Sequence, residues 1–181
     1  MQTFIEAKPL VPFPAYAEER ARAVGAIVWD DLDAPVVDVV RAFNELPHAF
    51  TLQCCHGHFL TARGQDEHDL APLPEGHHGA VRYRIAYMAF CVDDDAAGRK
   101  FLERAAGLPA LLDPAYVQFG CADWFWQQWV DSYVLQVEPV AHRFEDQASL
   151  SAGEALRTQS VRDAFFEELR DLLTEERRRV G

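Results

Sequence analysis

The sequence predicts a single α+β domain with a mainly antiparallel sheet of about four strands and helices packed on it. The chain has 181 residues, of which 49% are hydrophobic and 12% aromatic, and this suits one domain with a sizeable core. Helix and strand patterns follow one another along it without an internal repeat. The two clearest strand patterns are joined by a loop and not by a helix, so we expect them to pair antiparallel.

The first quarter of the chain predicts an extended segment and two helices. Residues 1–14 are rich in proline and are expected to run extended over the surface. Residues 15–26 mix charged and small side chains and predict a short surface helix. A second helix is expected to begin at Asp33, whose carboxylate would cap it ahead of Pro35 in its first turn. Its valines recur at the spacing of one helix face until Pro47 ends it.

Two strands separated by a long loop are predicted next. Residues 50–62 alternate as a strand, and so do residues 81–92. The stretch 63–79 between them is polar and rich in Gly, Pro, His and Asp. Long loops inside compact domains are often functional, so this loop is a candidate part of a site.

The second half of the chain predicts further helices and strands. The acidic triplet Asp93 to Asp95 is interpreted as the start of a helix rather than as a metal cluster, because carboxylates favour helix N-termini. That helix is expected to end at Gly107. The sequence then predicts a short strand, an aromatic helix, another strand and a long amphipathic helix, at residues 116–120, 123–129, 132–140 and 160–178.

Charge and composition bear on partners and location. The net charge of −12 disfavours nucleic acid as a general partner. No apolar run approaches the roughly 20 residues of a membrane span, and the N-terminus lacks a signal-peptide pattern. We therefore expect a cytoplasmic protein with reduced cysteines and no membrane partner. A homodimer through the C-terminal helix is an alternative arrangement.

The most unusual chemistry lies in the run Cys-Cys-His-Gly-His at residues 54–58. Thiolate and neutral imidazole are the usual zinc ligands. On a regular strand Cys54, His56 and His58 share one face, with about 7 Å between residues two apart. The sequence thus predicts a zinc site with these three as candidate ligands, of which two can reach one metal ion. Further ligands would come from elsewhere in the chain, with His77, His68, His78, Cys91 and His142 as the alternatives.

The same residues predict nucleophilic catalysis as a second hypothesis. Cys54 or Cys55 would supply the thiol, and His56 or His58 would act as acid or base. The alternative is structural, because free cysteine is often a small buried hydrophobe. The histidines would then pack beside aromatic rings and bond to the backbone.

A small-molecule pocket is the third hypothesis. Gly57 in a strand indicates a bulge or a close backbone approach, which would make room for a ligand or for a crossing ring. Trp126 and Trp129 lie three residues apart on one predicted helix face. They would line a pocket for a planar ligand or pack in the core. The common nucleotide-binding and hydrolase motifs do not occur in the sequence.

One segment also resembles a known family. Residues 36–57 are similar to the helix-then-strand segment of the wybutosine-synthesis tRNA methyltransferases, where Phe-Thr leads into Ser-Ser-Cys-x-Gly-Arg. Cys55 and Gly57 match the Cys and Gly of that pattern. In place of the two serines and the arginine stand Gln53, Cys54 and His58. The resemblance implies an S-adenosylmethionine-dependent RNA-modifying enzyme.

Three functions therefore remain open from the sequence. The first is a small-ligand or metal site around residues 54–58. The second is the S-adenosylmethionine-dependent enzyme that the resemblance implies. The third is a dimeric interaction protein without catalysis.

Overall fold

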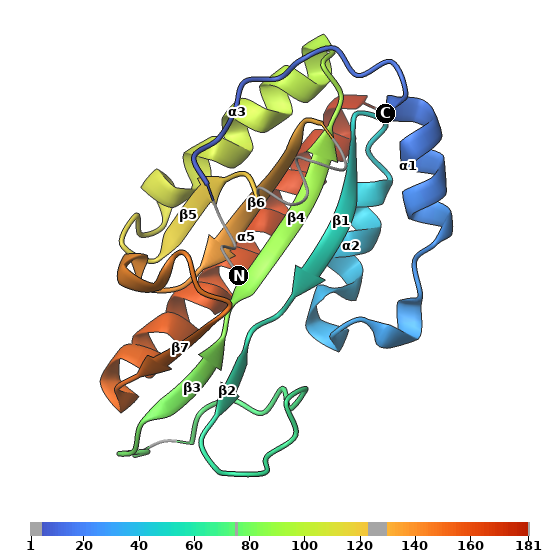
Figure 1. Ribbon diagram of the computed structural model, residues 1–181. Coiled ribbons are helices and arrows are strands. Elements are labelled where there is room, and N and C mark those ends of the chain that lie inside the picture. Colours follow the sequence, from blue (N-terminus) through green and yellow to red (C-terminus); the bar gives the residue numbers. More distant parts are fainter. Residues whose placement is uncertain (1–4, 75, 123–129, 181) are drawn as a thin grey trace.

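The computed structural model describes residues 5–74, 76–122 and 130–180, and it is an α+β fold, as the sequence predicts (Figure 1). A four-stranded antiparallel sheet has the order β1-β4-β6-β5, and a second, three-stranded sheet has the order β2-β3-β7. The helices are α1 (Tyr16–Gly25), α2 (Val37–Asn44), α3 (Ala96–Leu111) and α5 (Ala152–Val180). The strands are β1 (Ala49–Cys55), β2 (His58–Leu60), β3 (Val81–Arg84), β4 (Ala86–Val92), β5 (Val117–Gly120), β6 (Ser132–Val137) and β7 (Gln147–Leu150).

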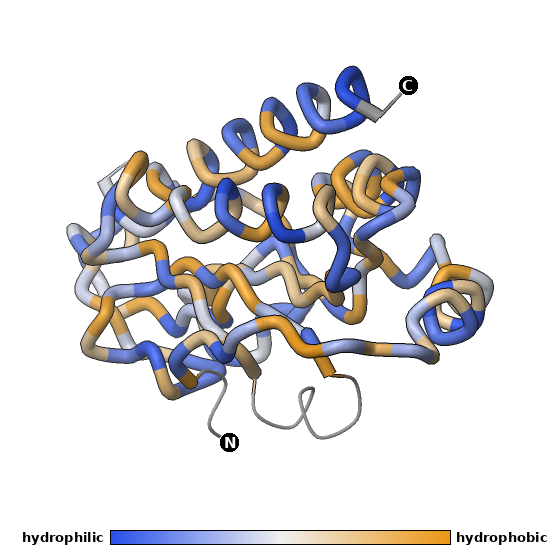
Figure 2. Tube along the Cα trace, turned by 90° about the horizontal axis from the view of Figure 1, so that it is seen from above, coloured by the Kyte–Doolittle hydropathy of each residue, from blue (hydrophilic) through white to orange (hydrophobic). Residues whose placement is uncertain are grey.

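The main core lies between one face of the four-stranded sheet and three helices. Helices α2, α3 and α5 gather on the same side of the sheet (Figure 2). Phe43 of α2 meets Phe90 of β4 and Phe101 of α3, with ring centroids 5.0 and 5.4 Å apart. Each such fully buried side chain stabilises the fold by about 1.5–3 kcal/mol. This core leaves the opposite face of the sheet, the outer face, available for a site.

Helix α1 stands apart from the other three. It packs beside the edge strand β1, where the Tyr16 ring lies 5.5 Å from that of Phe50. The Tyr16 hydroxyl donates a hydrogen bond to the carbonyl of Pro47 at 3.2 Å. Figure 1 shows α1 at the margin of the molecule, with β1 as its neighbour in the sheet. The edge of the sheet is thus flanked by a helix.

The two predicted strands 50–62 and 81–92 each divide into two, because the chain passes from one sheet to the other. The first leaves β1 at Cys55 and resumes as β2 at His58, while the second changes sheet at Ile85. The predicted antiparallel pairing is confirmed, since β1 pairs with β4 and β2 pairs with β3. The passage between the sheets places a bend at residues 56–57.

Gly57 makes that bend feasible. Its φ is +88°, a conformation that strains any residue with a Cβ. A Cβ there would lie 2.9 Å from the Cβ of Ala86 and 3.0 Å from the hydroxyl of Tyr83. That hydroxyl donates to the carbonyl of Val137 at 2.8 Å and accepts the N–H of Ala86 at 2.9 Å. The absence of a side chain at Gly57 thus allows the bend to pack closely against Tyr83 and Ala86.

Several element boundaries differ from those predicted. Helix α3 does not end at Gly107 but continues to Leu111, because Leu108 packs into the core. Its start is as expected, since Asp95 accepts the N–H of Gly98 at 2.6 Å. Helix α5 begins well before residue 160, and strand β7 was not predicted. The predicted aromatic helix 123–129 lies outside the described residues.

The long loop lies between β2 and β3. Residues 61–80 contain no helix or strand among those described, in agreement with the predicted loop at 63–79. Within the described ranges, no helix combines the length and the apolar character that a membrane span needs.

Candidate metal centre

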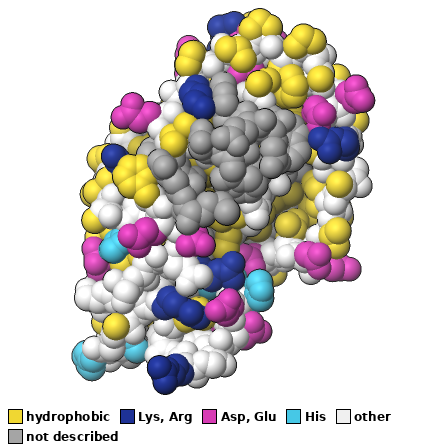
Figure 3. Space-filling model, in the orientation of Figure 1, with side chains coloured by type: hydrophobic (Ala, Val, Ile, Leu, Met, Phe, Trp, Pro, Cys, Tyr) yellow, Lys and Arg dark blue, Asp and Glu magenta, His cyan; other side chains and the backbone are white. Residues whose placement is uncertain are grey.

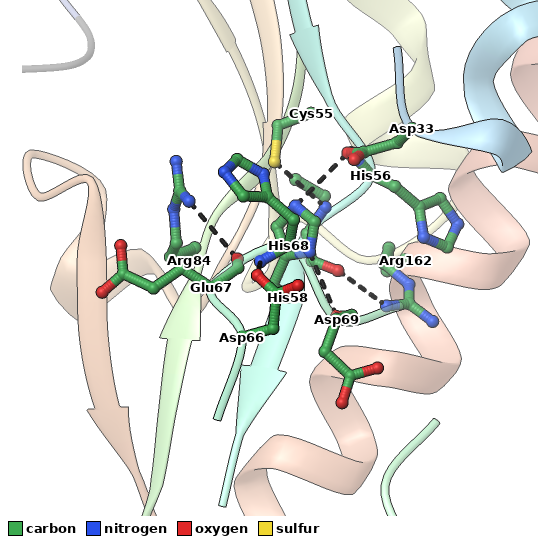
Figure 4. Close-up of polar contacts among 12 residues, drawn as sticks. Asp33, Cys55, His56, His58, Asp66, Glu67, His68, Asp69, Arg84 and Arg162 are labelled. Carbon is green, nitrogen blue, oxygen red and sulfur yellow. Dashed lines mark hydrogen bonds and ion pairs between the residues drawn. The ribbon is translucent and has the colours of Figure 1, made fainter. Parts of the chain in front are cut away.

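Three side chains with different donor atoms converge at the bend between the two sheets. These are Asp33, Cys55 and His58, and one ligand atom from each lies within 4.8 Å of the others (Figure 4). His58 is 2% exposed and Cys55 is 9% exposed. Around a tetrahedral zinc ion with bonds of about 2.0–2.3 Å, ligand atoms lie roughly 3.3–3.8 Å apart. A closure of about 1 Å would bring the group to that geometry.

Local backbone structure explains how the three side chains meet. Cys55 is the last residue of β1 and pairs with Tyr87 on the outer face of the sheet. Its Sγ accepts the N–H of Gly57 at 3.4 Å. His58 is the first residue of β2, so the bend turns its side chain back toward Cys55. The cluster thus depends on the change of sheet.

Asp33 comes from a different element, the turn before the short 3-10 helix Ala34–Val36. The carboxylate was expected to cap a helix, but it makes no capping hydrogen bond. Its Oδ2 instead accepts the backbone N–H of His56 at 2.8 Å and lies 3.3 Å from the Nε2 of His58. The cap interpretation is therefore wrong, and the carboxylate belongs to the cluster.

Hydrogen bonding determines which nitrogen of His58 faces the cluster. The Nδ1 lies 3.1 Å from the carbonyl oxygen of Asp69. A carbonyl can only accept, so Nδ1 carries a hydrogen and donates. In the neutral imidazole Nε2 is then a bare acceptor that faces the Asp33 carboxylate. Two acceptors face each other here, and a proton or a metal cation between them resolves the conflict.

The electrostatics of the pair agree with that geometry. The hydrogen bond to Asp33, followed by that to Cys55, raises the pKa of His58 to about 10, although burial opposes this. Burial by itself would raise the pKa of Asp33, but the contacts with His58 and with the N–H of His56 outweigh it and lower that pKa. Without metal, a proton therefore occupies the space between Nε2 and the carboxylate. A cation of higher charge can take its place.

The cluster forms part of the wall of a cavity of about 380 Å³. Strand β3 contributes Arg84, which pairs with His58 across the sheet. The loop contributes His68, whose ring centroid lies 5.9 Å from that of His58. The wall is completed by Asp31, Leu32, Gln53, Cys54, Ile85, Tyr87, Ala122, Val134, Gln136 and Asp146. The three donor groups thus face a space large enough for a small molecule.

His56 does not take part in the cluster. Its ring stacks on Phe166 of α5 with centroids 5.1 Å apart, on the helix side of the bend. Burial, reinforced by Arg162, lowers the pKa of His56 to about 4. The prediction that Cys54, His56 and His58 share one face is therefore wrong, because Gly57 interrupts the alternation. Cys55 is the thiol beside His58.

The other predicted site residues are dispersed. Cys54 lines the cavity, but it packs against the main core and burial raises the pKa of its thiol to about 12. His77 lies outside the group of three donors found among the described residues. Cys91 is buried against Tyr16 and Phe50. The two tryptophans, Trp126 and Trp129, lie outside the described residues.

The sequence interpretation missed two contributors. Asp33 was assigned to a helix start, and its separation of 22 residues from Cys55 offers no local pattern. The backbone carbonyl of Asp69 orients His58, and a backbone carbonyl cannot be recognised from a pattern of side chains. One signal did exist, because the loop at 63–79 was expected to be functional and supplies both His68 and this carbonyl.

Comparisons with known proteins identify no family for this chain. No protein-family model matches it, and no curated protein matches it. A solved structure, described as the PH1069 protein from Pyrococcus horikoshii, superposes with a TM-score of 0.48. The two chains are 11% identical over 89% of this chain and 94% of that one. We take no functional argument from a likeness of this size.

Proposed function

We propose that this protein binds one divalent transition-metal ion of the zinc class through Asp33, Cys55 and His58, and that the metal acts on a small molecule in the adjoining cavity. The observation that carries the proposal is the convergence of a carboxylate, a thiol and an imidazole within 4.8 Å. All three are ordinary zinc ligands. When bound, such a metal supplies Lewis acidity, which activates water or polarises a carbonyl group.

The surroundings of His58 support the proposal. A metal-binding histidine nearly always donates its other ring N–H to a carboxylate or to a backbone carbonyl. The Nδ1–H of His58 does so toward the carbonyl of Asp69. This fixes the ring and directs Nε2 toward Asp33 and Cys55.

The number of ligands favours a site of the catalytic kind. Structural zinc sites have four protein ligands, whereas catalytic ones have three and leave a position for water or substrate. The three groups lie on the wall of the 380 Å³ cavity, so the remaining position would face it. His68 and Arg84 line the same cavity. They would contact a substrate bound there or, in the case of His68, complete the coordination.

The decisive experiment is a titration of chelator-treated protein with zinc and with cobalt. We expect one ion per chain, and for cobalt a thiolate charge-transfer band with the visible spectrum of a tetrahedral site. The matched variants are Cys55→Ala, which should remove the band, and Cys54→Ala, which should keep it. Substoichiometric binding, or a band that depends on Cys54 and not on Cys55, would contradict the proposal.

The pH dependence of zinc binding provides a second check. Zinc must displace the proton of His58, whose pKa is raised to about 10 in the metal-free protein. Zinc affinity should therefore rise with pH up to that value, by about tenfold per unit for each proton displaced. Calorimetry in buffers of different ionisation enthalpy should show release of at least one proton. A pH-independent affinity between pH 6 and 9 would count against His58 as a ligand.

Thiol catalysis is a second candidate, favoured by the contact between Cys55 Sγ and the N–H of Gly57 at 3.4 Å. The contact places the Cys55 sulfur beside the ring of His58, which is the arrangement of a nucleophilic thiol with a neighbouring histidine. Alkylation of the metal-free protein separates the two candidates. Rapid labelling of Cys55 that His58→Ala abolishes supports a nucleophile, while a thiol that is inert without metal removes this candidate.

Two hypotheses from the sequence stay predictions. The residues that match the tRNA methyltransferase pattern, Cys55 and Gly57, both lie at this site. Binding of S-adenosylmethionine can therefore be tested by calorimetric titration. The homodimer through α5 can be tested by light scattering. The helix buries Phe165, Leu169 and Leu173 against its own chain, so only its remaining surface would serve such a contact.

A further inference from the structure

A second hollow of about 510 Å³ lies next to the candidate metal centre, between α1 and the edge strand β1. Its wall comes from the end of α1 and the chain after it, from one residue of α2, and from β1. The residues are Arg22, Ala23, Ala26, Ile27, Val28, Asp31, Leu32, Val40, Thr51, Leu52, Gln53 and Cys54. No polar cluster comparable to that around His58 occurs among these residues.

The two hollows share part of their walls. Asp31 and Leu32 from the turn after α1, and Gln53 and Cys54 from β1, line both spaces. Cys54 is the sequence neighbour of Cys55, so the second hollow begins one residue from the proposed metal ligand. These four residues thus form the common border of the two spaces, and a ligand that occupies both would pass along them.

The chemistry of the two hollows differs. The first holds the three donor groups together with His68 and Arg84, none of which lines the second. The second is walled mainly by aliphatic side chains, such as Ile27, Val40 and Leu52. On the face seen in Figure 3, hydrophobic side chains gather in the hollow beside β1. One molecule that fills both must therefore combine a polar and an apolar part.

Two consecutive apolar residues at or beside the second hollow are exposed. Val28, which lines the hollow, is 58% exposed, and its neighbour Trp29 is 39% exposed. The guanidinium of Arg41 lies 5.4 Å from the centroid of the Trp29 ring. Contiguous exposed apolar surface beside a groove is a feature of ligand-binding sites.

We propose that the substrate of this protein is amphipathic, with a polar metal-binding head in the first cavity and an apolar arm in the hollow between α1 and β1. The head depends on the proposed metal function, whereas the arm depends only on the second hollow. Seven of the twelve lining residues of that hollow are aliphatic, which favours an apolar arm over a polar one. An aliphatic chain or a flat apolar ring fits it best.

The test uses straight-chain alkyl hydroxamic acids of two, four, six and eight carbons, below their critical micelle concentrations, with the zinc-loaded full-length protein. The hydroxamate binds the metal and the alkyl chain reports on the hollow. We expect affinity to rise about threefold to fourfold per methylene until the hollow is filled. Equal affinity along the series would overturn the proposal.

Two variants locate the arm. Ala26→Phe places a ring in the hollow. It should lower the affinity for the eight-carbon hydroxamic acid to that for the two-carbon one, and the affinity for the two-carbon compound should stay unchanged. Ala21→Phe is the control, because Ala21 is exposed on α1, the helix whose C-cap is Ala26, and lies outside the hollow. Ile27→Ala tests the same wall without adding bulk and should lower the gain per methylene. An undiminished gain in both Ala26→Phe and Ile27→Ala would refute this location.

A second series separates this proposal from the proposed metal function. Fatty acids of the same lengths are titrated into chelator-treated protein, where no metal takes part. If zinc does not bind but affinity still rises with chain length and falls in Ala26→Phe, the metal function fails and the arm site stands. If zinc binds and neither series depends on chain length, the arm site fails and the metal function stands.

Discussion

His56 and His58 are two residues apart, yet their rings lie on opposite sides of the chain in contrasting environments. His58 meets a carboxylate and a thiol at the cavity wall, and these raise its pKa to about 10. His56 lies against Phe166 and beside the cation of Arg162, where burial lowers its pKa to about 4. The same residue type therefore has two different environments, and the local course of the backbone determines which one each ring enters. The bend at Gly57 sends one ring into the core and the other to the cavity.

The largest expected effect is on zinc affinity, which should respond differently to substitution of the two histidines. His58→Ala should weaken zinc binding by more than the ten- to hundredfold that loss of an outer-shell partner costs, because it removes a ligand. His56→Ala should change zinc affinity only slightly, since its contact with Asp33 is made by the backbone N–H. Competition with a chromophoric chelator measures both. Similar losses of zinc affinity in the two variants would contradict the assignment of His58, and not His56, as a ligand.

The second effect concerns the bend itself. Gly57→Ala should lower the free energy of unfolding by about 3–4 kcal/mol, because a positive φ and the contacts with Ala86 and Tyr83 both oppose a Cβ. Gly64→Ala is the control, since its φ is also positive but its Cβ would meet open space. Denaturant unfolding compares the two variants. Equal losses would show that backbone strain alone, and not the close approach, decides the effect.

The third effect is an acid sensitivity that belongs to His56. Its pKa is about 4 in the folded protein and near 6.5 in an unfolded chain, so the unfolded state gains the proton first. Stability should therefore fall as pH drops from about 6.5 to 4, by an amount on the order of 3 kcal/mol. The charged groups that face this ring are Arg162, Asp163, Asp33 and His58.

The variant that tests this effect is His56→Phe, which keeps an aromatic ring against Phe166 but cannot titrate. Its stability should vary less between pH 6.5 and 4 than that of the unaltered protein. Denaturant midpoints at several pH values provide the measurement. An unchanged pH profile would assign the acid sensitivity to other groups.

The smallest effect concerns the support of the bend from α5. Arg162 donates to the carbonyl of Gly57 at 3.1 Å and lies 5.1 Å from the centroid of the Phe59 ring. Arg162→Lys keeps the charge but loses the planar group, so we expect a loss of about 1–2 kcal/mol in stability. Zinc affinity should change less than in His58→Ala. A loss of zinc binding as large as in that variant would extend the metal centre to the helix side.

The fold was largely predictable because its signals are local. The helix face that contains Val39, Val40 and Phe43 and the alternation of residues 81–92 follow from periods of 3.6 and 2, which neighbouring residues determine. The end of α3 was not predictable in the same way. Gly107 looks like a terminator, but the burial of Leu108 against distant elements carries the helix further.

The α+β class, the antiparallel pairing of the two main strand regions and the concentration of Cys and His at residues 54–58 follow from the amino-acid sequence alone. Which of these side chains lie together depends on the packing of the folded chain. A regular strand would have joined Cys54, His56 and His58, but the positive φ of Gly57 interrupts the alternation and moves the chain into a second sheet. Asp33 then reaches Cys55 and His58 through space. No period along the chain encodes such a contact, because it depends on packing between elements that are remote in sequence.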